Sequence, residues 1–112
     1  MKKHIVLLGD STFDNQAYTD DEPDVISHLQ DVLPARWKAS LCAVDGSTAQ
    51  ELSAQIGRTA KRASHLIVSV GGNDALMNAD ILDTPVSSTA EALTLFGQRV
   101  DRFEVAYRSA IE

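Results

Sequence analysis

The stretch Ile5-Val6-Leu7-Leu8-Gly9-Asp10-Ser11 is the first of three similar passages in this chain. Its four leading residues are all apolar, which is typical of a parallel strand that is covered on both faces. A second apolar run, residues 41–44, leads to Gly46-Ser47-Thr48, and a third, residues 66–70, leads to Gly71-Gly72-Asn73-Asp74. Because parallel strands end at the same edge of a sheet, we expect these three polar strings to lie together.

Helical patterns separate the three expected strands, which cover residues 5–8, 39–44 and 66–70. Apolar residues recur at helical spacing over residues 25–33, where Pro23 suits the first turn of a helix. The alternation of strand and helix predicts right-handed crossovers and a parallel sheet with helices on both faces.

Two capping boxes predict where the later helices begin. Thr48-Ala49-Gln50-Glu51 predicts a helix that continues to Ala63, and Ser88-Thr89-Ala90-Glu91 predicts one that runs to Ile111. The second has the most regular apolar stripe in the chain, and we expect that stripe to face the core.

Composition limits the classes of protein that this chain can be. A length of 112 residues indicates one domain, and a net charge of −6 argues against a nucleic-acid partner. The apolar runs are too short for a membrane span or a signal peptide, so we expect a cytoplasmic protein whose single cysteine, Cys42, is a buried thiol. No metal-ligand or nucleotide-binding motif appears, and we expect no metal and no cofactor.

The three strings contain the groups that acyl transfer needs. The hydroxyl of Ser11 is a candidate nucleophile, although a serine attacks only when a base removes its proton. The backbone N–H groups of Ser11 and Gly46 and the side-chain amide of Asn73 are candidate donors to an oxyanion. Each string alone is an ordinary turn sequence. Their order after three separate strands is the informative feature.

On these residues the chain resembles the SGNH hydrolases, the GDSL-type lipase and esterase family. Gly9-Asp10-Ser11 is similar to the first block of that family, Gly46 to the second-block glycine, and Gly71-Gly72-Asn73-Asp74 to the third block. The resemblance implies hydrolysis of a small-molecule or lipid ester by Ser11, with Gly46 and Asn73 as oxyanion donors and Asp10, Gly72 and Asp74 beside the substrate.

The same resemblance implies a fold and indicates how much of the family's domain this chain contains. It predicts a flavodoxin-like, three-layer α/β/α fold with a parallel sheet, in which the three strands present here have the order 2-1-3. Residues 1–112 would be the N-terminal part of a single domain of this kind.

The last block of the family, Asp-x-x-His, has no counterpart in this chain. We expect His4 and His65, which begin strands, to lie at the opposite edge of the sheet, roughly 15–20 Å from Ser11. His28 falls in a predicted helix between Asp24 and Asp31, where a solvated face explains it. We therefore expect the general base to lie outside this chain.

Two alternatives stay open. The chain is either an inactive truncated domain that acts through interactions, or a flavodoxin-like or receiver-like binding module. A receiver would gather Asp10 and Asp74 around magnesium, but its lysine–proline pair is missing here. The strand at residues 66–70 carries no Lys, Pro or bulge signal, so self-association through its edge is a further expectation.

Overall fold

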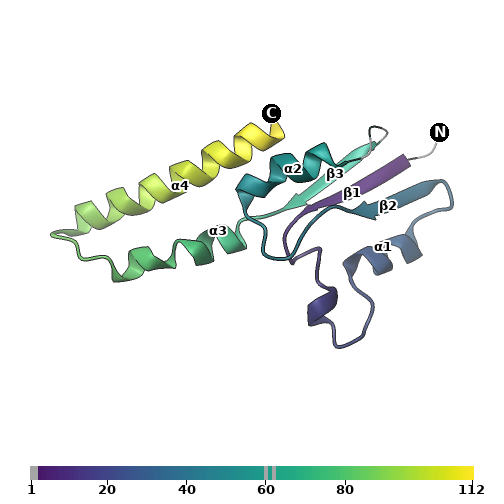
Figure 1. The fold of residues 1–112 in the computed structure, drawn as a ribbon, viewed down its shortest axis with the longest axis horizontal. Helices are drawn as coiled ribbons and strands as arrows, with labels where there is room; N and C mark the ends of the chain where they lie inside the picture. The colour runs from purple at the N-terminus through teal and green to yellow at the C-terminus, as the bar shows by residue number, and fades with distance from the viewer. Residues whose placement is uncertain (1–2, 60, 62) are drawn as a thin grey trace.

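The computed structural model describes residues 3–59, 61 and 63–112. Its sheet contains β1 (Lys3–Gly9), β2 (Trp37–Leu41) and β3 (His65–Ser69) (Figure 1). The order is β2-β1-β3, and β1 pairs in parallel with both neighbours. The predicted parallel sheet and its order are confirmed.

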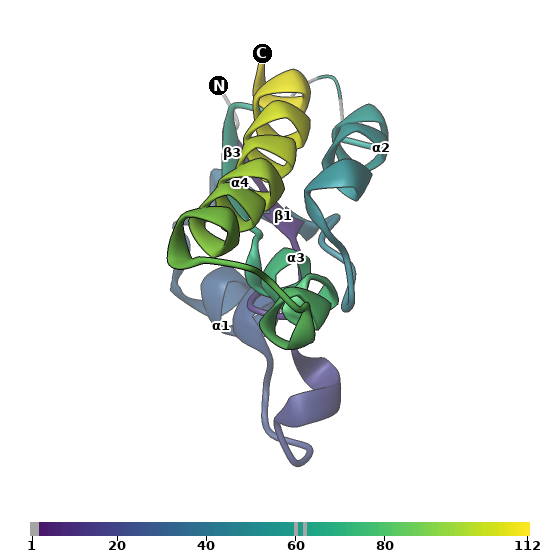
Figure 2. The same ribbon diagram turned by 90° about the vertical axis from the view of Figure 1, so that its left-hand side faces the viewer.

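Helices lie on both sides of this sheet. Helix α1 (Val25–Val32) lies on one side, and α2 (Leu52–Gly57) lies on the other (Figure 2). Val6 and Leu8 of β1 form the buried core with Leu52, and the C-terminal part of α4 (Thr89–Ile111) packs against that core through Tyr107. The three-layer architecture is that of a partial flavodoxin-like domain.

Hydrogen bonds at the termini set the helix limits. Asp24 caps α1 by accepting from the N–H of Ser27, so Pro23 precedes the cap and does not lie in the first turn as predicted. The capping box of Thr48 and Glu51 is present and opens a 3-10 turn, η2 (Ala49–Glu51), ahead of α2.

Two predicted boundaries are wrong. Helix α2 ends at Gly57 and does not reach Ala63. The N–H groups of Arg58 and Thr59 donate to carbonyls three residues back, which tightens the last turn. Ala60, on the predicted extension, lies outside the described residues. Strand β2 ends at Leu41 because the next two N–H groups both donate to the carbonyl of Leu7, which bends the chain.

The segment after β3 contains structure that the sequence did not predict. Helix α3 (Gly72–Met77) begins inside the Gly-Gly-Asn-Asp string, and a 3-10 helix, η3 (Ala79–Asp83), follows it. Another short 3-10 helix, η1 (Gln16–Tyr18), lies between β1 and α1. Helix α4 begins at the predicted place, with the Ser88 hydroxyl accepting from the N–H of Glu91.

The expectation that the α4 stripe faces the core is wrong for the first half of the helix. That half extends beyond the sheet (Figure 1), where Leu93 is 67% and Val100 61% exposed. Phe103 and Tyr107, further along, are partly buried. On β3, Leu66 and Ile67 are also exposed. Within the part of the chain that the structure describes, no helix combines the length and apolar character needed to cross a bilayer.

Candidate functional site

Each strand ends or is followed by a glycine with a positive φ angle. These are Gly9 at +124°, Gly46 at +88° and Gly71 at +128°. At Gly9 the requirement is steric as well, because a Cβ atom would lie 1.8 Å from the carbonyl oxygen of Ser69. Only glycine lets β1 leave the sheet at this point while it stays paired with β3.

A buried glutamine fixes the turn after β1. Gln55 of α2 is 1% exposed. Its side-chain oxygen accepts from the N–H of Gly9 at 2.7 Å, and its amide donates to the Gly9 carbonyl at 2.8 Å and to the Ser47 hydroxyl at 3.1 Å. The sequence did not single out Gln55. Its sequence position gives one indication of this role, because Gln55 is a polar residue on the buried face of a helix whose other buried residues are apolar.

Ser11 lies on the turn that Asp10 organises. Asp10 is buried, and its N–H donates to the carbonyl of Ser69 at 3.1 Å. One carboxylate oxygen accepts from the N–H of Thr12 at 3.0 Å. The other lies 4.0 Å from where a Cβ of Gly72 would be. The turn that carries Ser11 is therefore adjacent to the start of α3, and Ser11 itself is partly exposed.

Two hydrogen bonds join the strings that follow β2 and β3. The side-chain amide of Asn73 donates to the main-chain carbonyl of Ser47 at 3.0 Å. The carboxylate of Asp74 accepts from the N–H of Ala49 at 3.0 and 3.2 Å. Asn73 and Asp74 thus bind the backbone that follows Gly46, while Gln55 binds the side chain of Ser47. The catalytic and substrate-binding roles expected of these residues stay predictions.

The loop between β1 and α1 borders the Gly46 turn as well. The carboxylate of Asp14 accepts from the N–H of Asp45 at 2.7 Å, and the hydroxyl of Tyr18 donates to the Asp45 carboxylate at 2.7 Å. This hydrogen bond raises the pKa of Tyr18, since ionisation would place two negative charges together.

Two of the three histidines lie at the opposite ends of the strands from these strings. His4 and His65 are at the amino ends of β1 and β3, as predicted, and their rings contact the hydroxyls of Ser40 and Ser64. His28 lies in α1, which packs against β2. Among the described residues, no group of three or more His, Cys, Asp and Glu side chains gathers as a metal site.

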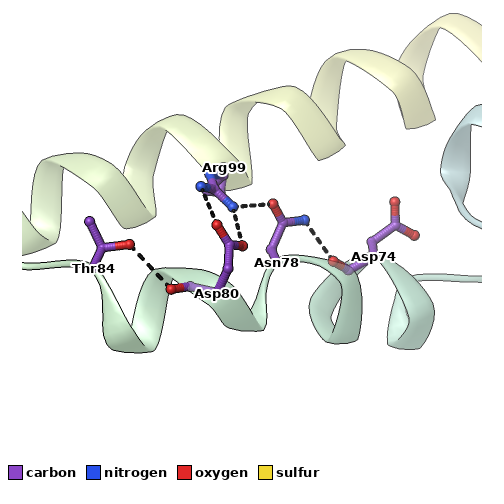
Figure 3. Close-up of polar contacts among 5 residues, drawn as sticks. All are labelled: Asp74, Asn78, Asp80, Thr84 and Arg99. Carbon is purple, nitrogen blue, oxygen red and sulfur yellow. Dashed lines mark hydrogen bonds and ion pairs between the residues drawn. The ribbon is translucent and has the colours of Figure 1, made fainter.

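A polar chain connects the site to α4 (Figure 3). The side-chain amide of Asn78 donates to the carbonyl of Asp74 at 2.7 Å, and Arg99 donates to the side-chain oxygen of Asn78 at 2.6 Å. Arg99 also forms an ion pair with Asp80 at 3.0 Å. Its hydrogen bond and charge lower the pKa of Asp80. No motif in the sequence indicates this connection.

Comparison with known proteins identifies a solved structure with a similar fold. No family model matches the sequence, and no curated protein matches it. Among solved structures, the chain is similar to a mutant of the esterase AlinE4, with a TM-score of 0.54 and 21% identity over 93% of this chain. The chain spans only 54% of that structure's chain, about half its length. At this identity the likeness shows the fold alone.

Proposed function

We propose that this chain is the N-terminal part of a single SGNH-type domain that hydrolyses carboxylic esters, with Ser11 as the nucleophile. Two findings support the proposal. The fold is similar to that of an esterase, of whose chain this one spans about half. The polar strings that resemble the SGNH blocks also follow the three parallel strands. A hydrogen bond joins the second and third strings, and Gln55 bonds to both Gly9 of the first and Ser47 of the second.

The hydrogen bond from Asn73 to Ser47 is the observation that carries the proposal. A side-chain amide has two N–H donors. One of them, bonded to Ser47, fixes the orientation of the Asn73 amide. The other has no partner among the described residues and is available to a substrate oxygen. The N–H groups of Ser11 and Gly46 supply the other two donors of the proposed oxyanion hole.

The reaction follows the usual steps of serine acyl transfer. A base removes the Ser11 hydroxyl proton while the oxygen bonds to the ester carbonyl carbon. The tetrahedral oxyanion is held by the N–H groups of Ser11 and Gly46 and by Asn73. It collapses with cleavage of the bond to the alcohol oxygen, which takes the proton from the base. Water then attacks the acyl-enzyme by the same route and releases the acid and free Ser11.

Three further residues border the substrate in this proposal. Asp10 and Gly72 meet where the Ser11 turn approaches α3, and Asp74 bonds to the backbone beyond Gly46. The two carboxylates already accept backbone N–H groups. We infer that Asp10 and Asp74 position the nucleophile and the oxyanion donors rather than transfer protons.

The proposed mechanism requires a general base that lies outside residues 1–112. In a serine protease, loss of the catalytic serine or histidine alone costs about 10⁶ in kcat. We therefore expect the chain by itself to hydrolyse activated esters very slowly. Imidazole added to the solution can act as the missing base, provided that the nucleophile and the oxyanion donors are in place.

The test is hydrolysis of p-nitrophenyl acetate by the 112-residue chain at increasing imidazole concentration, with Ser11→Ala measured in parallel. We expect an imidazole-dependent rate above that of Ser11→Ala. Ser87→Ala, which changes an exposed serine before α4, should keep the full rate. Equal rates for the native chain and Ser11→Ala would favour the inactive domain or the binding module. Fast Ser11-dependent turnover without imidazole would place a base within the chain, and His28→Ala would then be the first variant to measure.

A further inference from the structure

The charges of this chain are separated between the two edges of its sheet. The stretches of sequence that lead into the three strands contain Lys and Arg but neither Asp nor Glu; they are residues 1–5, 33–40 and 58–65. The stretches that follow the strands contain Asp and Glu but neither Lys nor Arg; they are residues 9–24, 42–51 and 70–91. Because the strands are parallel, one edge of the sheet is basic, and the other, which carries the candidate site, is acidic.

Five described residues supply the positive charge of the first edge, which we call the basic edge: Lys3, Arg36, Lys38, Arg58 and Lys61. All five side chains are exposed, and none of them forms an ion pair with another described residue. The pairing of β1 with β2 brings Lys3 opposite Trp37, and the connection between α2 and β3 lies on the same side of the sheet (Figure 1). Exposed cations that have no counterion within the chain attract an anionic partner.

The single tryptophan of the chain, Trp37, belongs to the basic edge. It is partly buried, with the centroid of its ring 5.4 Å from that of His65 and 5.8 Å from the Nζ atom of Lys3. Tryptophan is enriched where a membrane meets water, because its ring is apolar and its N–H is polar. Clustered Lys and Arg bind anionic lipid headgroups. The basic edge therefore combines two features of a surface that binds an anionic bilayer.

The acidic edge does not cancel the attraction of the basic edge. Strand β1 has 7 residues, and at about 3.3 Å per residue it separates the two edges by roughly 20 Å. The Debye length at physiological ionic strength is about 8 Å. An anionic surface in contact with the basic edge is therefore largely screened from the acidic edge.

We propose that the basic edge binds the surface of an anionic phospholipid bilayer and leaves the candidate site facing the solution. This binding does not depend on the proposed function, because it uses the opposite edge of the sheet. A nucleic acid fits the observations less well. The net charge of the chain is −6, and a base would stack on the ring of Trp37, which already contacts Lys3 and His65.

The experiment measures binding of the 112-residue chain to lipid vesicles. Vesicles of phosphatidylcholine are compared with vesicles of phosphatidylcholine and phosphatidylserine in equal parts, and a blank without vesicles corrects for self-association. We expect the chain to sediment with the mixed vesicles and not with phosphatidylcholine alone. The fluorescence of Trp37 should shift to shorter wavelength on binding, and high salt should abolish both effects because it screens the charges.

A pair of double variants locates the surface. Arg36→Gln with Lys38→Gln removes two charges from the basic edge and should lower the partition coefficient by about tenfold or more. Arg102→Gln with Arg108→Gln is the matched control, since it removes the same charge from exposed positions on α4. The control should bind within about twofold of native. Circular dichroism checks that both variants are folded.

Several results would overturn the inference. They are the absence of binding to either vesicle, equal binding to both kinds of vesicle, equal loss of binding in the two double variants, and sedimentation with an unchanged Trp37 spectrum. Tighter binding to duplex DNA or to polyglutamate in competition with the mixed vesicles would also overturn it, because the partner would then be a nucleic acid or an acidic polypeptide.

Discussion

The side-chain amide of Asn73 lies 3.0 Å from the main-chain carbonyl oxygen of Ser47 and donates a hydrogen bond to it. This contact joins the segments that follow β2 and β3, the two strands that flank β1 in the sheet. It sets the Asn73 amide beside the Gly46 turn, as the proposed oxyanion hole requires.

Replacement of Asn73 tests that role. We expect Asn73→Ala to lower the imidazole-dependent, Ser11-dependent rate by about 10²–10³, since removal of one oxyanion donor has effects of this size. Asn73→Asp keeps the size of the side chain but brings a negative charge to the oxyanion, and it should be at least as slow. The measurement is hydrolysis of p-nitrophenyl acetate, with circular dichroism as the check on folding. An Asn73→Ala variant that is folded and fully active would remove Asn73 from the mechanism.

Replacement of Gly9 tests the turn after β1. A Cβ there meets the Ser69 carbonyl oxygen at 1.8 Å, and φ is +124°. We expect Gly9→Ala to lower the free energy of unfolding by about 3 kcal/mol or more, from overpacking and backbone strain together. Urea denaturation measures this. Gly57→Ala is the control: Gly57 ends α2 with nothing within 4 Å of its Cβ position, and alanine there should be neutral or stabilising by up to about 1 kcal/mol. Equal stability of the two variants would contradict the described turn.

The strands and the site strings could be predicted because their signals are local. A continuous apolar run followed by glycine was enough to place β1 and β3. It did not predict that Leu66 and Ile67 of β3 are exposed, and the apolar run at residues 41–44 lies mostly beyond the end of β2. Helix α3 was not predicted, because Gly71-Gly72 reads as a turn, although the chain after Gly71 is helical. Ala63 was wrongly assigned to a helix, since the apolar spacing continues past the point where Gly57 ends it.

Features that depend on contacts between elements far apart in the sequence could not be predicted. Periodicity identified α4 as a helix, but whether Leu93 and Val100 are covered depends on what packs opposite them. Gln55 binds Gly9 only because α2 lies over the end of β1. The Arg99–Asp80 ion pair forms only because α4 folds back beside η3. No local sequence pattern predicts the angle between these two elements.

The Arg99–Asp80 pair should be visible in an acid titration. Because Arg99 lowers the pKa of Asp80 in the folded state, the pair stabilises the fold above the unfolded-state pKa. That stabilisation is lost as the pH falls through the folded-state pKa. We expect Arg99→Leu to return the pKa of Asp80 toward its ordinary value in an NMR titration of the carboxyl carbon. Arg108→Leu, which removes the exposed partner of Glu104, should leave Asp80 unchanged. An identical Asp80 titration in both variants would show that the pair does not form in solution.

The edge of β3 should make the chain associate with itself. Strand β3 pairs only with β1 in the described sheet, and Ile67 is 43% exposed. Such an edge pairs with another strand unless a charge discourages it. We expect concentration-dependent association in sedimentation velocity, weakened by Ile67→Lys. Ile111→Lys, at an exposed residue in the last turn of α4, should associate like the native chain. A native chain that stays monomeric and unfolds cooperatively would contradict this prediction and indicate a self-contained small domain.

The covalent state of Ser11 decides whether the proposed acyl-enzyme forms. The chain is mixed with p-nitrophenyl acetate and imidazole, quenched in acid and mapped by mass spectrometry after proteolysis. The account predicts an acetyl group on Ser11 that depends on imidazole, is weaker in Asn73→Ala and is absent from Ser11→Ala. Imidazole-dependent hydrolysis above the Ser11→Ala rate with no acetyl group on Ser11, or acetylation of Ser11 that Asn73→Ala leaves unchanged, would contradict the proposed acyl-enzyme and its oxyanion hole.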